Sequence, residues 1–479
     1  MSNTSKASQR INALLDDNSF VEIGALVTAR ATDFNLKPAD APSDGCITGY
    51  GVIGGNPVYV YSQDVSVLNG TMGEMHAKKI ANLYDLAMKT GAPIIGLLDS
   101  AGLRLQEATD AMNAFGELYL KQVLASGVIP QITAVMGNCG GGLAVLSTMA
   151  DFTFMEEKNA KLFVNSPNAL EGNYTAKCDT ASAQFQSKES GIVDVVGDEA
   201  TIIAKIRELI SFLPANNEDY QGSLEECTDD LNRVNPEIEG CIGDTSIAAK
   251  ILADDNVFFE VKATYEKSMV TGFIRLDGAT VGVVANRSEV CDENGIVIDG
   301  EKMGTAITKK GCEKAADFVR FCDAFDIPIL TLTNATGFEA TKCSEKGMAK
   351  AIARLTYAFA NATVPKVNVI VDKAFGTAYT IMNSKAIGAD ITIAWPNAQI
   401  GTMDSALAAK IMYEGQGADV INEKAQEYKE LQLGATSAAR RGYVDQIVTP
   451  GLTRKYVIGA FEMLFTKSED RPAKKHGTV

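Results

Sequence analysis

The sequence matches itself at a fixed offset, and this internal repeat constrains the fold more than any other feature. Five pairs of residues lie 235 positions apart (for the first pair, 328 − 93): Pro93 and Pro328, Asp99 and Asn334, Gly102 and Gly337, Pro130 and Pro365, and Gly141 and Gly376. Upstream, Gly55 pairs with Gly278 at an offset of 223 (278 − 55), so the second copy has 12 extra residues (235 − 223). We place this insertion in the polar segment 288–299. So long a period is typical of two similar domains in tandem, not of a solenoid.

The size and composition of the chain fit two domains. With 479 residues and 51.0 kDa, a single core is improbable, and we expect domains at residues 1–230 and 231–479. Hydrophobic residues make up 46% of the chain and charged residues 22%, which is enough apolar material for two cores. The acidic, polar segment 221–236 is interpreted as the linker.

Both halves alternate short apolar runs with amphipathic segments. In the first half we expect strands at 92–99 and 130–136, a helix over 101–127 between them, and a second helix starting within 140–150. The second half repeats this order with strands at 327–334 and 365–371, a helical segment within 337–362, and a helix within 375–388. The pattern predicts an α/β fold with helices covering parallel or mixed sheets.

Charge and targeting signals exclude several classes of protein. A net charge of −16 and a pI near 4.8 argue against nucleic-acid binding, which needs clustered lysine and arginine. The polar amino terminus does not resemble a signal peptide. The sequence contains no run of about 18 consecutive apolar residues, the length that a membrane-spanning helix needs. Nine cysteines without a CxxC pair favour reduced thiols in a cytoplasmic protein. His76 and His476 are too few for a histidine-rich metal site, so no metal is expected.

The most plausible site of chemistry is the glycine-rich turn at 137–145, with the sequence GNCGGGLAV. Gly140, Gly141 and Gly142 join a strand directly to a helix, so unpaired backbone N–H groups face outward at the positive end of the helix dipole. Such a turn attracts a phosphate or an oxyanion, and the residues alone do not choose between them. The alternative is a turn required only for tight packing of the strand on the helix.

The second copy supports an oxyanion role. Gly376, Thr377 and Ala378 stand at the equivalent place and offer backbone donors in the same way. Two such nests suit a reaction in which two carbonyl oxygens become anionic. A serine or cysteine triad is excluded because neither histidine is near either turn in sequence. Cys139, inside the first nest, is interpreted as a small packing residue and not as a nucleophile.

Several blocks in a characteristic order resemble the carboxyltransferase subunit of biotin-dependent acyl-CoA carboxylases, of the propionyl-CoA carboxylase beta chain and methylmalonyl-CoA decarboxylase alpha type. In the first half these blocks are SQDVSVLNGTMGEMHAKKI, MKTGAPIIGLLDSAGLRLQEA and LASGVIPQITAVMGNCGGGLA. In the second half they are KAADFVRFCDAFDIPILTL, YAFANATVPKVNVIV, ADITIAWPNAQIG and RRGYVDQIVTP. The resemblance covers nearly the whole chain from about Gly45 onward.

The resemblance implies two tandem crotonase-like domains related by internal duplication. It also implies transfer of a carboxyl group between carboxybiotin and the alpha carbon of a short-chain acyl-CoA. By this match, the amides of Gly141 and Gly142 hold the enolate oxygen of the acyl-CoA. The biotin oxygen is held by the amides of Thr377 and Ala378. Further expected contacts are Gly102, Arg104 and Gly140 on the acyl-CoA side, and Gly376 and Thr380 on the biotin side.

The resemblance also implies partners. Lys89 lies in a sequence that superficially resembles a biotinylation site, but it falls in a helical run, so we expect biotin on a separate biotin carboxyl carrier protein. A biotin carboxylase or a membrane decarboxylase subunit is then a further partner. Members of this family assemble as hexamers, with each active site between the amino-terminal domain of one chain and the carboxy-terminal domain of another.

Departures from the family pattern leave alternatives open. Residues 100–104 have the sequence SAGLR where the family has SGGAR, residues 335–341 have ATGFEAT in place of VPGFxPGxxQE, and residues 376–380 have GTAYT in place of GGAYD. These changes leave room for altered acyl specificity or weaker carboxylation. One alternative is the carboxyltransferase subunit of a sodium-pumping decarboxylase. Another is a catalytically weak structural subunit of a mixed hexamer.

Charged residues near the first turn also have two interpretations. Lys78, Lys79 and Arg104 are candidates for contacts to the phosphates of coenzyme A, although lysines on a helix surface more often face solvent. Glu107 is a candidate base for an enoyl-CoA hydratase. Because Glu107 falls in a block that matches the carboxyltransferases, we favour the carboxyltransferase interpretation.

Overall fold

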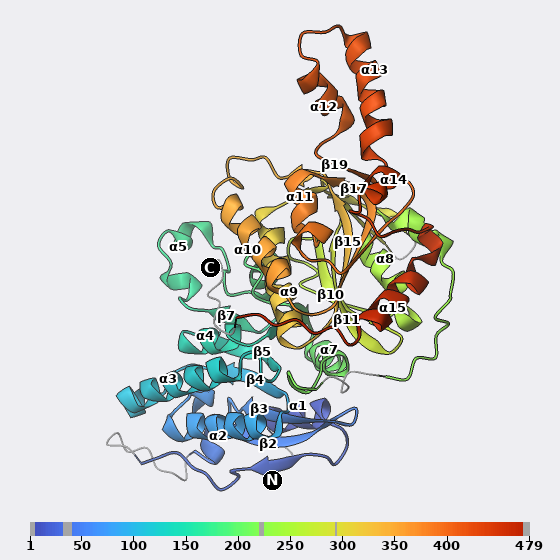
Figure 1. Cartoon of the computed structure of the whole chain (residues 1–479). Helices are drawn as coiled ribbons and strands as arrows, with labels where there is room; N and C mark the ends of the chain where they lie inside the picture. Colours follow the sequence, from blue (N-terminus) through green and yellow to red (C-terminus); the bar gives the residue numbers. More distant parts are fainter. Residues whose placement is uncertain (1–4, 32–40, 220–224, 293–294, 473–479) are drawn as a thin grey trace. The chain divides into compact units, whose positions relative to one another are not determined.

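The computed structural model describes residues 5–31, 41–219, 225–292 and 295–472. The chain divides into two compact units, Met1–Ser223 and Leu224–Val479, which run from blue to green and from green to red in Figure 1. Residues 221–224 of the expected linker and His476 lie outside the described residues. The linker is bound to the second unit from Glu225 onward, since the Glu225 amide donates to the Gly278 carbonyl at 3.0 Å.

The first unit is built on an eight-stranded sheet with the order β1-β2-β3-β4-β5-β6-β8, and β7 pairs with β5. The strands are β1 (Val21–Ile23), β2 (Cys46–Ile53), β3 (Asn56–Gln63), β4 (Ile94–Ser100), β5 (Gln131–Gly140), β6 (Phe152–Glu156), β7 (Lys161–Phe163) and β8 (Val195–Gly197). The first three are antiparallel, and the pairs from β3 onward are parallel. The helices are α1 (Lys6–Leu14), α2 (Glu74–Thr90), α3 (Ala108–Ala125), α4 (Gly142–Thr148), α5 (Asn173–Ala176), α6 (Ala183–Lys188) and α7 (Glu199–Phe212).

The second unit repeats this sheet. Its order is β9-β10-β11-β15-β17-β18-β20, and β19 pairs with β17. Its strands are β9 (Phe258–Val261), β10 (Met269–Leu276), β11 (Ala279–Asn286), β15 (Ile329–Ala335), β17 (Lys366–Phe375), β18 (Ile391–Ala394), β19 (Gln399–Gly401) and β20 (Gln446–Ile447). The helices are α8 (Thr245–Leu252), α9 (Lys309–Ala324), α10 (Met348–Asn361), α11 (Gly376–Ile381), α12 (Ser405–Met412), α13 (Ala418–Tyr428), α14 (Ala435–Arg440) and α15 (Thr453–Leu464).

The two sheets correspond strand for strand, as the internal repeat predicts. In each unit the first three strands are antiparallel, parallel pairing follows, and a short side strand joins the fifth strand of the path. The central strands β4 and β15 are buried along their whole length, as expected for parallel strands covered on both faces. The helical hairpin of α12 and α13 projects from the rest of the second unit in Figure 1.

The opening hairpins of the two sheets use equivalent turns. Gly54 and Gly55 join β2 to β3 with φ values of 55° and 88°, and Asp277 and Gly278 join β10 to β11 with φ values of 53° and 75°. Two successive positive φ values are typical of the turn that best fits the twist of a hairpin. The structural equivalence of Gly55 and Gly278 therefore explains their offset of 223.

The insertion expected in the second half forms a separate two-stranded sheet. Strands β12 (Glu289–Cys291) and β13 (Val297–Lys302) pair antiparallel between β11 and α9, and residues 293 and 294 lie outside the described part. A further short pair, β14 (Ala306–Ile307) and β16 (Gly337–Phe338), is parallel. The extra residues thus lengthen a connection and leave the main sheet unchanged.

Three element boundaries differ from the sequence expectations. Helix α3 begins at Ala108 and not at residue 101, because Gly102 and Arg104 exchange backbone hydrogen bonds with Met72, which hold the chain extended. Strand β5 continues to Gly140 because its last residues pair with β7. Strand β17 continues to Phe375 because it pairs with β19 in the same way. Among the described residues, no helix is long and apolar enough to cross a membrane.

Candidate functional site

The first glycine turn joins the end of β5 to the start of α4. Gly141 has a φ of 62° and a ψ of −126°, a conformation that favours glycine, and a Cβ added there would meet nothing within 4 Å. The backbone conformation, and not a lack of space, therefore requires glycine at this position. Gly142 is exposed and opens α4, so its amide has no partner within the helix.

The contacts of Gly141 revise its expected role. The Gly141 amide donates to the Phe163 carbonyl of β7 at 2.9 Å. This N–H is therefore occupied in the sheet and is not free to hold an oxyanion in this conformation. Of the two amides expected on the acyl-CoA side, Gly142 remains the candidate donor. Gly140 packs against the Phe163 ring, which a Cβ at position 140 would meet at 2.8 Å.

Gly102 lies beside the glycine turn, as expected, but its amide is also occupied. A Cβ added to Gly102 would lie 3.7 Å from the Gly140 carbonyl oxygen, so the two segments approach closely. The Gly102 amide donates to the Ser100 hydroxyl at 3.0 Å, and its carbonyl accepts from the Met72 amide at 2.8 Å. With a φ of 101°, Gly102 supports the wall of the turn through its backbone conformation.

Arg104 does not present its side chain to a ligand. The residue is fully buried, and Nη1 forms ion pairs with the carboxylates of Asp44 and Glu107. Nη2 donates to the Thr71 carbonyl at 2.6 Å. The expectation that Arg104 contacts the substrate is therefore revised, because its guanidinium joins three segments of the protein. Glu107 is equally enclosed and accepts from the Glu74 amide at 2.6 Å, which argues against an exposed base.

The two adjacent lysines of α2 have different environments. Lys79 is buried, and its ammonium donates to the carbonyls of Ser43 and Cys46, so it does not contact a phosphate. Lys78 is exposed and forms an ion pair with Glu74, one turn earlier on α2. Lys89 is also exposed, in the last turn of the same helix and not at a hairpin tip. This placement agrees with the expectation that Lys89 is not the biotin attachment site.

Cys139 is fully buried between the sheet and α4. Burial raises the pKa of its thiol well above the usual value, so the reactive thiolate is strongly disfavoured. Cys139 is therefore a packing residue beneath the turn, in agreement with the sequence interpretation.

The second glycine turn has the same construction. Gly376 follows β17 with a φ of 58°, and a Cβ added there would lie 3.1 Å from the Thr402 carbonyl oxygen. Thr377 is exposed in the first turn of α11, and Ala378 is buried behind it. The Thr380 hydroxyl donates to the Gly376 carbonyl at 3.3 Å and so stays within the helix. Burial raises the pKa of the adjacent Tyr379 to about 12.

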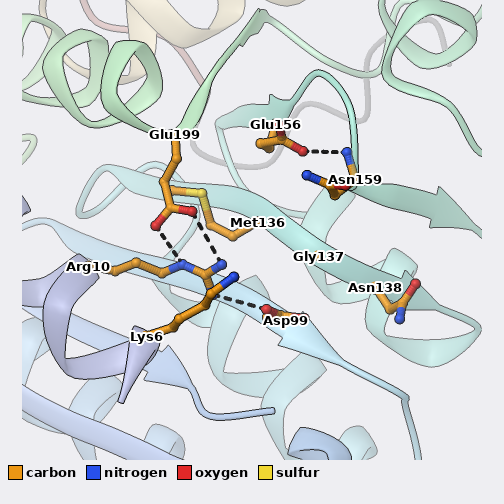
Figure 2. A pocket seen from close by; sticks show the side chains of 9 residues that line it. All are labelled: Lys6, Arg10, Asp99, Met136, Gly137, Asn138, Glu156, Asn159 and Glu199. Carbon is orange, nitrogen blue, oxygen red and sulfur yellow. Dashed lines mark hydrogen bonds and ion pairs between the residues drawn. The ribbon is translucent and has the colours of Figure 1, made fainter. Parts of the chain in front are cut away.

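A polar cavity of about 370 Å³ lies at the carboxyl ends of β4, β5 and β6 (Figure 2). Its lining residues are Lys6, Arg10, Asp99, Met136, Gly137, Asn138, Glu156, Asn159 and Glu199. Arg10 donates to Glu199 at 2.9 Å and to Asp99 at 3.0 Å, and both contacts are visible in Figure 2. A Cβ at Gly137 would collide with the Asp99 carboxylate at 2.0 Å. The ion pair with Asp99 joins α1 to β4, and the ion pair with Glu199 joins α1 to α7.

The sequence interpretation missed Tyr119. This residue projects from α3, and its hydroxyl donates to the Gly142 carbonyl at 2.7 Å. Its distance from Gly142 in the sequence gives no signal of this contact. The spacing of apolar residues on α3 indicates only that Tyr119 is near the core.

Comparison with known proteins decides the family. The Carboxyl transferase domain family matches residues 3–479. The chain belongs to this family. Two relatives in the carboxyl transferase family match over almost the whole chain. The propionyl-CoA carboxylase beta chain of Roseobacter denitrificans is 38% identical over 99% of this chain and 93% of its own length. The methylmalonyl-CoA decarboxylase subunit alpha of Propionigenium modestum is 37% identical over 99% of this chain and 92% of its own length.

A solved carboxyl transferase structure has the same fold. Transcarboxylase 12S, described as a hexamer with methylmalonyl-CoA and methylmalonic acid bound, is 34% identical to this chain. It superposes with a TM-score of 0.90 and covers 98% of this chain and 91% of its own. Together with the two corresponding sheets, this similarity confirms the expectation of tandem crotonase-like domains.

Proposed function

We propose that this chain is the carboxyltransferase subunit of a biotin-dependent acyl-CoA carboxylase. It transfers a carboxyl group between carboxybiotin on a separate carrier protein and the alpha carbon of a short-chain acyl-CoA. The observation that carries this proposal is the family match over residues 3–479, together with relatives that act on propionyl-CoA and methylmalonyl-CoA and align along almost their full length.

The acyl-CoA side is assigned to the turn at Gly142. Removal or addition of the alpha carboxyl group passes through an enolate, whose negative charge on the thioester oxygen needs a hydrogen-bond donor. The exposed Gly142 amide supplies this donor at the positive end of α4. Because the amide belongs to the backbone, it is already oriented before the charge develops. The neighbouring Gly102 lies close to the turn without adding a side chain to its surface.

The biotin side is assigned to Thr377 and Ala378. Biotin, when bound on its carrier, supplies the group that carries the carboxyl unit. The residues present fit its neutral ureido ring, since the start of α11 has no side-chain cap and Thr380 carries no charge. Thr377 is exposed in the first turn of α11, where its amide has no partner within the helix, and this amide is the first proposed donor to the ureido oxygen. The Ala378 amide, in the same first turn of α11, is the second proposed donor.

The partners and assembly belong to the same proposal. We place biotin on a biotin carboxyl carrier protein, with a biotin carboxylase or a membrane decarboxylase subunit as the second partner and a homohexamer as the assembly. Transcarboxylase 12S forms a hexamer, which supports this assembly. The chain is almost equally identical to a carboxylase subunit (38%) and a decarboxylase subunit (37%). We assign the direction of net transfer to the partner subunit.

The test is a transfer assay with the purified chain. The protein is incubated with malonyl-CoA or methylmalonyl-CoA and either free biotin or a biotinyl carrier, and loss of the substrate carboxylate is measured. We expect loss that depends on biotin, with a preference among the acyl groups. The control omits biotin and should show no loss.

Absence of turnover with every acyl-CoA, in a protein that is folded and hexameric, would contradict the proposal. That result would favour the alternative of a structural subunit in a mixed hexamer. The exchange of the family's GGAYD for GTAYT at residues 376–380 is the observation behind this alternative. Restored activity on mixing with an active paralogue would support the alternative.

A further inference from the structure

Tyr119 connects α3 to the first turn of α4. Its hydroxyl donates to the Gly142 carbonyl oxygen at 2.7 Å, a favourable length for an O–H···O hydrogen bond. The ring packs beside Phe115, with their centroids 6.2 Å apart and the planes tilted by 49°. Phe115 is buried in the core of the first unit, so the position of the Tyr119 ring is defined by packing.

The turn that receives this hydrogen bond needs external support. Helix α4 has seven residues, and so short a helix has little stability of its own. It begins after successive glycines, which lose more conformational entropy on ordering than other residues do. Two contacts hold the turn: the Gly141 amide donates to Phe163 on β7, and the Gly142 carbonyl accepts from Tyr119 on α3.

The side chain of Tyr119 also fills the space beside Gly142. A Cβ added at position 142 would lie 2.8 Å from the Tyr119 hydroxyl oxygen and 3.3 Å from the Phe115 ring. The Tyr119 hydroxyl can therefore lie this close only because residue 142 has no side chain. A substitution of either residue alters the same contact.

We infer that Tyr119 is a positioning residue for carboxyl transfer. By donating to the Gly142 carbonyl it holds Gly142 in place at the start of α4, so that the Gly142 amide, which belongs to the preceding peptide group, faces the substrate oxygen. This inference rests on the proposed function. The hydroxyl itself need not touch the substrate, because it acts through the carbonyl of the residue that supplies the donor. A displacement of about 1 Å in the reacting groups reduces a rate by up to about a hundredfold. Loss of the hydrogen bond between Tyr119 and Gly142 should therefore lower the rate of transfer measurably.

The first experiment compares Tyr119→Phe with the wild-type chain in the transfer assay. This change keeps the ring and removes only the hydroxyl. We expect kcat to fall about tenfold, in line with the loss of one neutral hydrogen bond, while KM for the acyl-CoA changes by less than about twofold. An unchanged kcat in an active protein would overturn the inference and leave the proposed function standing.

Tyr84→Phe is the matched control. Tyr84 is buried in the same unit, and its hydroxyl donates at 3.2 Å to Gln131, which begins β5, whereas the glycine turn follows the other end of this strand. Its loss should lower the melting temperature and leave kcat within about twofold of wild type. Equal losses of kcat in both variants would show a general effect of destabilisation and would overturn the positioning role.

A double-mutant cycle tests the coupling directly. Gly142→Ala keeps the amide but pushes the Tyr119 hydroxyl away, so it should also reduce kcat about tenfold. The double variant should be less than about threefold slower than either single variant, because both changes break one contact. Losses of kcat that simply multiply would overturn the inference.

Hydrogen exchange provides a result that does not depend on activity. The Ala144 amide donates to the Gly141 carbonyl at 3.1 Å within the turn. In Tyr119→Phe we expect the peptide spanning residues 140–148 to exchange about tenfold faster, with the rest of the unit unchanged. Unchanged exchange of this peptide in Tyr119→Phe would reject Tyr119 as a support of the turn, whatever the activity. Absence of carboxyl transfer by the wild-type chain would reject the proposed function instead.

Discussion

Lys79 and Lys314 occupy equivalent positions in the two units and make equivalent contacts. They lie 235 residues apart (314 − 79), on α2 and α9 respectively, and both are buried. The Lys79 ammonium donates to the carbonyls of Ser43 and Cys46. The Lys314 ammonium donates to the carbonyls of Lys262 and Tyr265, at 2.9 Å and 2.8 Å. The duplication has therefore preserved a buried lysine that joins a helix to a segment beside the opening hairpin.

Lys79→Met should destabilise the chain without acting on a ligand. The change removes the hydrogen bonds that the ammonium donates to the Ser43 and Cys46 carbonyls, which keep one other donor each, the Cys46 amide and the Ser43 hydroxyl. We expect a loss of about 1–3 kcal/mol in the free energy of unfolding. Lys78→Met is the matched control at the adjacent exposed position, with an expected loss below about 0.5 kcal/mol. Urea unfolding measures both free energies. Equal losses in the two variants would show that the buried contacts of Lys79 do not stabilise the fold.

Gly142→Pro should remove the proposed donor while keeping the start of α4. Proline is tolerated at the first position of a helix because the N–H there has no helical partner. We expect transfer to fall about 100- to 1,000-fold, whereas Gly142→Ala, which keeps the N–H, should lose about tenfold. Stabilisation by acyl-CoA in a thermal melt should remain in part for both variants. Equal activity of the two variants would reject the Gly142 amide as the donor.

Thr377→Pro should separate the two sides of the reaction. It removes the exposed amide in the first turn of α11, with an expected loss of transfer of about 100-fold. Binding of acyl-CoA, measured by calorimetry, should keep its Kd because the change lies on the biotin side. Thr377→Ala retains the amide and should keep activity within about threefold. Weaker acyl-CoA binding in the proline variant would contradict the assignment of sides.

Arg104→Gln should affect stability and not the recognition of phosphate. The change leaves the carboxylates of Asp44 and Glu107 buried without their cation, so we expect a loss of about 3–5 kcal/mol. The salt dependence of acyl-CoA binding to the remaining folded protein should be unchanged. A shallower salt dependence in the variant would instead support a direct contact between Arg104 and the phosphates of coenzyme A.

His76 should make the first unit less stable in acid. The ring is fully buried, Nδ1 lies 2.9 Å from the Asp44 carbonyl oxygen, and Nε2 lies 3.2 Å from the Gln63 amide nitrogen. Burial and, to a smaller extent, the nearby charges of Arg104 and Lys79 together lower the pKa of His76 to about 3. The unfolded chain therefore binds the extra proton first as the pH falls.

Between about pH 6.5 and pH 3, this difference in pKa should cost the folded state up to about 1.4 kcal/mol for each pH unit. The measurement is the free energy of unfolding against pH, in wild type and in His76→Gln. The variant should lack this contribution, so the difference between the two curves should change across the window. Parallel curves would show that His76 does not titrate differently in the folded and unfolded states.

Much of the architecture followed from local pattern. The runs at 92–99 and 327–334 became β4 and β15, because strands buried on both faces are continuously apolar. The ends of β5 and β17 were not predictable in the same way, since they depend on pairing with β7 and β19, which follow later in the chain. The start of α3 was also displaced by a partner outside its own segment, the loop at Met72.

The amino-acid sequence alone was enough to establish the duplication, the α/β class and the location of both glycine turns, because these depend on composition and spacing along the chain. The resemblance of its sequence blocks to those of known proteins indicated the family. Only the tertiary structure decided which groups are available at the first turn. It assigned the Gly141 amide to Phe163, enclosed Arg104 between two carboxylates, and brought Tyr119 to the Gly142 carbonyl. Each hydrogen-bonding group has only a few partners. Which partner it has depends on the segments that folding brings next to it, and these segments can be far apart in the sequence.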